Sequence, residues 1–535
     1  MSGFVFPQGW CSARLADLVL GPKSITYGVL KPGPFAPEGR VLLRVKDVVA
    51  GVVDDTDAYR ITEQLHRQFQ KSELRGGEVV LSIQGTVGRV ARIPKHLEGA
   101  NISRTLAVLR PAYEEGTSWI WAMLQTPQVG STLRGCITGS TRDSLNLEDL
   151  RDVAIPVPPL NEQRRIVAKI EELFSKLDAG VAALERVRAG LKRYRAAVLK
   201  AAVDGKLTED WRAQHPDTEP ASVLLERILT ERRRKWEVDQ RVESEREGSG
   251  LPKGWLGRYR TPEGVRDPEL PPLPDRWAWA TVDQLADVGT GTTPLRSKKE
   301  YFQEGSIPWV TSTAVNQPVV RSASEFVTER ALKATTLRIY PAQTLIVALY
   351  VEGKTRGKVS ELAIDATINQ ALAALVMVGV SSSCRAYLKS HLAANYEKLR
   401  RQAAGGMQPN LNLGLVRSIV VALPPLAEQV QIVAEVERRL SIVDEIETQV
   451  ESNLKRAARL RQGILKRAFE GDLVPQDPTD EPAEQLLDRI RHDRQSSNSS
   501  ENGKPAARRR GPRRKTIAAP SLFPKNDGID ERDES

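Results

Sequence analysis

The chain contains one long segment twice. Residues 145–207 return without a gap at 411–473, so that Pro158–Gln163 (Pro-Pro-Leu-Asn-Glu-Gln) is matched by Pro424–Gln429 (Pro-Pro-Leu-Ala-Glu-Gln). The interval from 145 to 411 is far longer than the roughly 20–50 residues of a solenoid repeat. The sequence therefore predicts two copies of a large module, each ending in the same kind of helix. Together the two copies would hold a two-part target at a fixed separation.

The correspondence extends beyond this segment. Pro7–Trp10 resembles Pro274–Trp277, at almost the same offset. Between these two anchors the similarity is weak and is carried by single residues. This pattern predicts one ancestral fold with a shared ending and divergent middles. The matching single residues are Gly85, Gly88 and Asn101 in the first copy and Gly353, Gly357 and Asn369 in the second.

Composition narrows the class of protein. A chain of 535 residues predicts roughly three or four domains, and its net charge of +10 favours either a polyanionic partner such as nucleic acid or simply a soluble basic protein. Cys11, Cys136 and Cys384 form no CxxC pair, which fits a reducing cytosol and argues against a disulfide framework or a zinc site. With no signal-peptide pattern at the start and no apolar run long enough to span a bilayer, we expect a soluble, cytoplasmic protein.

The middles of the two copies have the pattern of mixed strand and helix. Val79–Ile83 and Thr344–Leu349 are short aliphatic runs bounded by glycine or proline, which is typical of buried strands. Shorter helical patterns surround them. We therefore expect an α+β chain in which each middle is an α/β-type globular domain.

The endings have a heptad pattern that predicts long helices. Each begins after a Pro-Pro pair, since proline is tolerated in the first turn of a helix, and ends near Gly205 or Gly471. Such helices would be about 60 Å long. The apolar seam requires a partner, which we expect to be the helix of the other copy; two separate homodimeric coiled coils are the alternative. The seam residues are Ile166, Ile170, Leu173, Leu177, Leu184, Val187, Leu191, Tyr194 and Val198, then Ile432, Val436, Leu440, Val443, Ile446, Val450, Leu454, Ala457, Leu460 and Ile464.

Motifs for chemistry are nearly absent. Gly353-Lys354-Thr355 fits a relaxed phosphate loop, but Ala348 stands where the first glycine belongs, and Arg356–Val359 has the pattern of a turn and strand rather than the required helix. The five histidines are scattered without metal-ligand spacing, and no Gly-x-Ser-x-Gly elbow occurs. We predict no catalytic residues and no metal site, and we expect the chain to recognise a binding partner rather than to catalyse a reaction. A nucleic-acid-dependent NTPase using Gly353-Lys354-Thr355 is the alternative, and a coiled-coil scaffold without a DNA role is a third hypothesis.

Twice the chain places Pro-Pro-Leu-x-Glu-Gln-x-x-Ile-Val, or a close variant, at the start of a long helix, and this resembles the specificity (S) subunit of type I restriction-modification enzymes. The resemblance covers roughly residues 7–210 and 273–490. The long 206–272 insert and the basic tail depart from it. Further segments that fit the same family are Ile307–Trp309, Gly353–Gly357, Ile368–Ala371, Gly139–Arg142 and Gly405–Gln408.

The resemblance implies two target-recognition domains, each reading one half of an interrupted DNA sequence, and two helices packed as an antiparallel coiled-coil spacer with pseudo-twofold symmetry. It implies double-stranded DNA, two methyltransferase (M) subunits and restriction (R) subunits as partners, and no membrane. We expect no cofactor in this chain, with S-adenosylmethionine, ATP and Mg in the partner subunits. The expected segments are recognition domain 1 (1–157), spacer helix 1 (158–205), a short helix with a charged Pro/Gly linker (206–272), recognition domain 2 (273–423), spacer helix 2 (424–471), a short helix (472–494) and a disordered basic tail (495–535).

Two groups of residues are candidates for contacts. Basic side chains in the divergent middles are candidates for DNA binding, by contacting phosphate or reading base edges. The Pro-Pro-x-x-Glu-Gln residues are expected to start and cap the spacer helices or to meet the methyltransferase partner rather than DNA. The DNA-binding candidates are Arg89, Arg104, Arg142, Arg296, Lys298, Lys354, Arg356 and Lys358; the helix-start candidates are Pro158, Pro159, Glu162, Gln163, Pro424, Pro425, Glu428 and Gln429.

Overall fold

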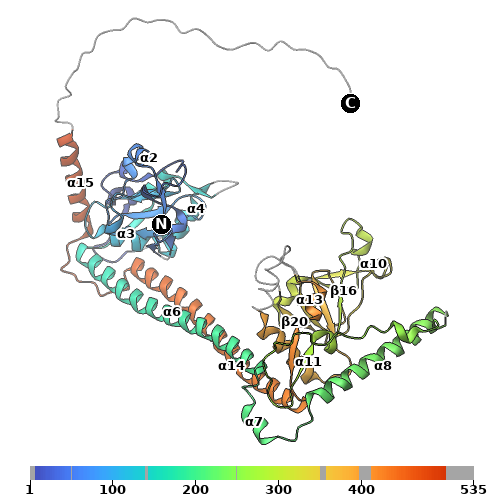
Figure 1. Ribbon diagram of the computed structural model, residues 1–535. Helices are drawn as coiled ribbons and strands as arrows, with labels where there is room; N and C mark the ends of the chain where they lie inside the picture. The colour runs from blue at the N-terminus through green and yellow to red at the C-terminus, as the bar shows by residue number, and fades with distance from the viewer. Residues whose placement is uncertain are drawn as a thin grey trace, which may run out of the picture. The chain divides into compact units, whose positions relative to one another are not determined.

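The computed structural model describes residues 6–49, 51–138, 143–248, 250–349, 357–396 and 411–501 (Figure 1). The chain forms two compact units. Unit 1 consists of Met1–Asp178 and Ala458–Ser535, and unit 2 consists of Ala179–Ala457. Each unit therefore combines one recognition domain with parts of both long helices. The predicted α+β class with two α/β-type domains and two long helices is confirmed.

Recognition domain 1, in unit 1, is built on two small sheets. The order of the larger sheet is β2-β10-β7-β8, and that of the smaller is β6-β3-β9. Val79–Ile83, predicted to be a buried strand, forms β7, whose four residues are all buried. The strands of these two sheets are β2 (Thr26–Tyr27), β3 (Arg40–Leu43), β6 (Tyr59–Ile61), β7 (Val79–Ser82), β8 (Val90–Arg92), β9 (Asn101–Ile102) and β10 (Leu106–Leu109). Two short ladders pair β4 (Val48–Val49) with β5 (Val52–Val53) and β11 (Ile137–Thr138) with β12 (Ser144–Leu145). The helices are α1 (Leu15–Leu18), α2 (Glu63–Gln68), α3 (Gly116–Leu124), α4 (Pro127–Gly135) and α5 (Leu147–Arg151).

Recognition domain 2, in unit 2, repeats this plan with a larger sheet. The order of its main sheet is β15-β22-β19-β20-β17, and that of its second sheet is β18-β16-β21. The predicted strand Thr344–Leu349 forms the buried β19. The strands are β15 (Asp287–Thr290), β16 (Ile307–Val310), β17 (Val319–Val320), β18 (Glu325–Val327), β19 (Leu345–Ala348), β20 (Val359–Leu362), β21 (Thr367–Ile368) and β22 (Leu372–Val376); the helices are α9 (Val282–Leu285), α10 (Glu329–Ala334), α11 (Ser382–Ala394) and α13 (Leu413–Arg417).

A two-stranded ladder joins each domain to its long helix. In unit 1, β1 (Cys11–Arg14) pairs antiparallel with β13 (Ala154–Val157), and in unit 2, β14 (Ala278–Thr281) pairs with β23 (Val420–Leu423). The Pro-Pro pair follows β13 and β23 directly. Because proline cannot donate to a ladder but fits the first turn of a helix, it marks the change from strand to helix.

The long helices are α6 (Leu160–Val203) and α14 (Leu426–Glu470). Within unit 2, Arg195 of α6 pairs with Asp444 and Glu447 of α14, while Val198 and Ala202 share a core with Val436 and Ile432. Residue numbers rise along one helix as they fall along the other, so the helices pack antiparallel. The predicted pairing within the chain is confirmed.

The apolar seam is buried less continuously than its heptads predicted. Its ends enter the domain cores, with Ile166 and Ile170 in unit 1 and Val198 in unit 2. In the stretch of the seam within unit 2, however, Val187 and Tyr194 are each 46% exposed and Ile446 is 38% exposed. Two helices alone cannot cover these side chains.

A further helix follows each long helix and packs on the domain of its own unit. α8 (Ala221–Glu247) buries Leu224 and Ile228 in unit 2, and α15 (Ala483–Glu501) buries Leu487 and Ile490 in unit 1. Both run further than the short helices expected, and α15 extends into the segment expected to be a disordered tail. Residues 502–535 lie outside the described residues. In the part of the chain that the structure describes, no helix combines the length and the apolar character needed to cross a membrane.

Candidate nucleic-acid interface

The Pro-Pro-x-x-Glu-Gln motif of unit 1 fastens the recognition domain to the start of α6. Trp10 donates its indole N–H to Oε2 of Glu162 at 3.0 Å, and Tyr113 donates its hydroxyl to Oε1 of Gln163 at 2.9 Å. Gln163 in turn donates to the carbonyl oxygen of Pro158 at 2.9 Å. Glu162 and Gln163 are almost fully buried. The motif therefore connects the first strand, the domain core and the helix.

Most of this arrangement recurs in unit 2, although Oε1 of Gln429, unlike that of Gln163, has no hydrogen-bond partner among the described residues. Trp277 donates to Oε2 of Glu428 at 2.8 Å, and Gln429 donates to the carbonyl oxygen of Pro424 at 2.8 Å. Here the second carboxylate oxygen is also satisfied, because Oε1 of Glu428 accepts from Thr208 at 2.7 Å and from Arg212 at 3.1 Å. This carboxylate is thus fully paired.

In unit 1 the corresponding oxygen lacks these donors. Oε1 of Glu162 has no hydrogen-bond partner among the described residues. The sequence explains the difference, since the repeat places Val474 where unit 2 has Thr208. Burial raises the pKa of Glu162 above its ordinary value, although the bond from Trp10 and the charge of Arg165 act in the opposite direction.

These contacts give the side chains of the motif partners within the same chain. Its glutamates and glutamines were expected to cap helix N–H groups or to face a methyltransferase subunit. The structure buries them against indole, hydroxyl and carbonyl groups of the same chain. Pro158, Pro159, Pro424 and Pro425 are buried with them. Trp10 and Trp277 are the functional residues that the sequence analysis missed, although both already marked the start of the repeat.

Two grooves in equivalent places of the repeat hold the basic candidates Arg89 and Lys358. Arg89 follows Gly88, and Lys358 follows Gly357, both glycines having a positive φ that favours this residue type. A long-helix arginine also lines each groove: Arg461 beside Arg89, and Arg195 beside Lys358. These two arginines occupy the same position of the repeat and were not among the candidates.

Groove 1, in unit 1, has a volume of about 810 Å³. Its charged lining residues are Arg89, Arg134 and Arg461, and no Asp or Glu lines it among the described residues. Arg89 donates to the carbonyl oxygens of Val45 and Val48 at 3.3 and 3.2 Å. Arg461 is paired with Asp178, which lies outside the lining. The groove still favours an anionic occupant, because its lining carries arginines and no acidic side chain among the described residues.

Groove 2, in unit 2, has a volume of about 750 Å³ and a mixed charge. Lys358 donates to Oδ1 of Asn316 at 2.8 Å, and Lys389 lies 3.5 Å from the carboxylate of Glu361. Asp444 pairs with Arg195 on the same lining. Groove 2 is therefore less strongly cationic than groove 1.

The other candidates lie apart from the grooves. Arg296 forms an ion pair with Glu325 at 2.7 Å, which raises its pKa, and stacks on the rings of Phe302 and Trp309. Lys298 donates to the hydroxyl of Tyr301 at 3.2 Å. Arg104 is exposed in unit 1. Arg142, Lys354 and Arg356 lie outside the described residues.

A family model for the type I restriction modification DNA specificity domain matches residues 43–185 and 274–456, which is more than half of the chain. The chain belongs to the type I restriction-modification DNA specificity family. Each match covers most of one recognition domain and the first part of the long helix that follows it. The resemblance drawn from the doubled helix motif is confirmed.

Individual relatives of the chain are named as specificity subunits of type I restriction enzymes. The chain is 26% identical over 523 residues to the type I restriction enzyme EcoKI specificity subunit of Escherichia coli strain K12, an alignment that covers 95% of this chain and 100% of the relative. It is 29% identical over 235 residues to the EcoBI specificity subunit of Escherichia coli, covering 43% of this chain and 49% of that relative.

A solved structure supports the shared fold. One chain of a type I restriction-modification system superposes with a TM-score of 0.56 at 19% identity, covering 88% of this chain and 100% of that chain. The relatives are specificity subunits, which supports a protein that is not itself an enzyme.

The alternative of an NTPase gains no support from the family or from the structure. Gly353-Lys354-Thr355 lies outside the described residues, and the chain that follows forms the strand β20 rather than a helix. Among the described residues, no group of three His, Cys, Asp or Glu side chains is placed to hold a metal ion.

Proposed function

We propose that this specificity-family chain recognises DNA in two halves, with recognition domains 1 and 2 each reading one half of an interrupted site. The observation that carries the proposal is a buried hydrogen bond that occurs once in each unit, from Trp10 to Glu162 and from Trp277 to Glu428. Each bond fixes a recognition domain to the start of its own long helix. A rigid attachment of this kind can orient two different DNA-contacting surfaces in the same way relative to their helices. The divergent middles of the two copies supply the difference.

The grooves support a contact with the DNA backbone. Lysine and arginine that neutralise phosphates provide sequence-independent affinity and set the register of a protein on the duplex. Arg89 and Arg134 in groove 1 are suited to this task. Sequence would then be read by neighbouring side chains that reach base edges in the major groove.

The antiparallel helices act in this proposal as the spacer that sets the gap between half-sites. Two DNA contacts on one face of B-form DNA favour centres about one turn, roughly 34 Å, apart. A pair of long helices packed through a shared seam resists bending and stretching, so it can hold such a separation constant.

Partner subunits carry out the chemistry in this proposal. The exposed apolar residues Val187 and Tyr194 of α6 and Ile442 and Ile446 of α14 form a stripe within unit 2 that a methyltransferase subunit could cover. Adenine methylation with S-adenosylmethionine and cleavage with ATP and Mg would belong to methyltransferase and restriction subunits.

The test is to map methylated adenines across the host genome with and without this gene, and to assay the purified chain alone. We expect a bipartite methylated sequence that disappears with the gene, and no methyl transfer, nuclease or ATPase activity in the isolated chain. Methyl transfer by the chain alone would overturn the proposal. A failure to show salt-dependent affinity for duplex DNA, alone or with its partners, would favour a scaffold instead.

A further inference from the structure

The part of segment 206–272 that follows the repeated first half of α8 is explained neither by the repeat nor by the family resemblance. In the structure the second half of the segment folds back along α8. The ring of Trp236 on α8 stacks on Trp255 at 5.7 Å and meets Tyr259 at 5.3 Å, with Arg241 over the Trp255 ring. The chain then reaches recognition domain 2 as a short extended piece, Arg260–Glu263, which we call the strap.

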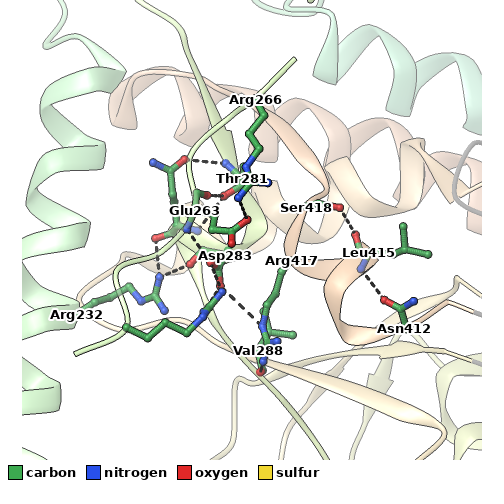
Figure 2. Close-up of polar contacts among 12 residues, drawn as sticks. Arg232, Glu263, Arg266, Thr281, Asp283, Val288, Asn412, Leu415, Arg417 and Ser418 are labelled. Carbon is green, nitrogen blue, oxygen red and sulfur yellow. Dashed lines mark hydrogen bonds and ion pairs between the residues drawn. The ribbon is translucent and has the colours of Figure 1, made fainter. Parts of the chain in front are cut away.

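The strap is anchored on the buried carboxylate of Asp283, which is 2% exposed. Arg260 donates to both carboxylate oxygens, at 3.0 and 2.8 Å, and the backbone N–H of Glu263 donates to Oδ2 at 2.8 Å. Thr281 returns a bond to the carbonyl oxygen of Glu263 at 2.6 Å. Figure 2 shows Asp283 at the centre of these contacts. A bidentate arginine on a buried carboxylate is among the stronger polar contacts in proteins.

The charge of Asp283 is maintained by these neighbours. Burial alone would raise the pKa of its carboxyl group, but the bonds from Arg260 and from the Glu263 backbone, with the charge of Arg232, lower the pKa below its ordinary value. The carboxylate is therefore ionised and fully engaged at neutral pH.

Among the residues that the structure describes, this anchor is found in unit 2 and not in unit 1. Arg232 of α8 donates to the backbone carbonyl oxygens of Asp283 and Gln284, and Arg494 of α15 makes the equivalent contacts with Ala16 and Val19 in unit 1. The repeat thus shares the arginine that caps the short helix. It places Ala16, however, where unit 2 has Asp283, so unit 1 offers a strap no carboxylate at this position.

From Asp283 the contacts continue to the edge strand of the main sheet. Nε of Arg417 lies 3.9 Å from Oδ1 of Asp283, and Nη2 of Arg417 donates to the carbonyl oxygen of Val288 in β15 at 2.8 Å. Figure 2 shows Arg417 between Asp283 and Val288. Two residues on, the carbonyl oxygen of Thr290 accepts from Tyr340 at 2.8 Å. Both ends of this edge strand are therefore held.

β15 leads directly to basic side chains of domain 2. At Gly291 the backbone approaches Ile368 so closely that a Cβ atom would lie 1.6 Å from its carbonyl oxygen. Trp309 then donates to the carbonyl oxygen of Thr292 at 3.2 Å, and Arg296 stacks on Trp309. A displacement of β15 would pass along this tightly packed path to Arg296.

We infer that Asp283 and the strap position β15 and the basic loop after it, and thereby set the base discrimination of recognition domain 2. This inference rests on the proposed function. Segment 206–272 is then a part of domain 2 that acts on one half-site, rather than a passive linker. Asp283 and Arg260 are positioning residues that act through Arg417 and β15.

The test compares methylation motifs in cells that carry the full chain with its methyltransferase subunits. Arg260→Lys keeps the charge but loses the bidentate geometry, and Asp283→Asn removes the charge. We expect either change to lower discrimination against single-base mismatches by about tenfold in one half-site and to leave the other half-site unchanged. Arg227→Ala is the matched control. Arg227 lies on α8, is about as exposed as Arg260 and pairs with Glu219 away from the strap.

Each outcome decides the question. Unchanged discrimination in both half-sites, or equal relaxation of both, would overturn the positioning role. Complete loss of one half-site together with a lower melting temperature in both variants would show that domain 2 unfolds, which also overturns it. Absence of any bipartite methylation motif in cells that carry the wild-type chain would refute the proposed function itself. This outcome is distinguishable from the others, because it is measured in the wild-type sample and not in the variants.

Discussion

Trp277 donates its indole N–H to a glutamate whose carboxylate is completely paired, whereas its repeat equivalent, Trp10, is the only hydrogen-bond donor to Glu162 among the described residues. The two junctions are thus alike in geometry and unlike in electrostatics. Glu428 takes part in an ion pair with Arg212, while Oε1 of the buried Glu162 has no hydrogen-bond partner among the described residues. The same substitution should therefore have different effects at the two sites.

Glu428→Gln should destabilise the chain by about 2–3 kcal/mol, because the new amide NH₂ faces donors and Arg212 loses its charged partner. Glu162→Gln should change the free energy of unfolding by less than about 1 kcal/mol, since one amide oxygen can still accept from Trp10. Urea denaturation of the two full-length variants measures both values. Equal losses at both positions would contradict the asymmetry.

The raised pKa of Glu162 predicts a pH dependence. The folded chain holds the Glu162 proton to higher pH than the unfolded chain, whose carboxyl titrates near the ordinary 4.5, so this group contributes stability below 4.5 that is lost as pH rises through the folded pKa. Glu162→Gln should remove that decline. Urea midpoints of wild type and variant, compared from pH 4.5 upward, should diverge in favour of the variant. Parallel curves would rule this out.

Local patterns predicted the long helices and the buried strands but not the contacts between distant segments. The heptads located α6 and α14 because a sustained seam depends on neighbouring residues alone. The bond from Trp10 to Glu162 joins residues 152 positions apart, which no local pattern reveals. In the sequence, the sign of this bond was that both Trp10 and Glu162 have repeat counterparts, Trp277 and Glu428, at nearly the same interval.

The sequence predicts a short helix followed by a charged linker in 206–272, whereas α8 continues to Glu247. In the structure the second half of α8 is supported by pairs one turn apart, such as Arg233 with Glu237 and Lys235 with Asp239, and by the stacking of Trp236. The strap contacts of Asp283 depend on tertiary packing, so the sequence could not place them. Arg195 and Arg461, by contrast, stood at equivalent positions of the repeat and could have been found by asking which charges recur.

Groove 1 should contribute more to DNA affinity than groove 2. Arg89→Ala or Arg134→Ala should each reduce the slope of log affinity against log salt by about 0.9, the value for one lost phosphate contact, and weaken binding similarly for all sequences. Lys389→Ala in groove 2 is the comparison, because its ammonium already has Glu361 as a partner. Duplex binding by the chain with its partner subunits, measured over a range of salt, gives the slopes. A larger change for Lys389→Ala would exclude groove 1 as the stronger phosphate contact.

Lengthening the spacer should change the gap and nothing else. In unit 2, Arg195 faces Asp444, so Arg186, nine residues earlier, and Asn453, nine residues later, lie at corresponding heights of the two helices. Inserting four residues, about one turn, after each of these positions adds about 6 Å. At about 3.4 Å per base pair this predicts a preferred gap about two base pairs longer.

The half-sites should remain the same, because neither recognition domain contains an inserted residue. Methylation motifs from cells carrying the lengthened chain measure gap and half-sites together. Insertion into α6 alone is the control: it puts Arg195 out of register with Asp444 and should reduce methylation without producing a new gap. An unchanged gap in the double insertion would refute the spacer role, since the separation would then be set by something other than α6 and α14.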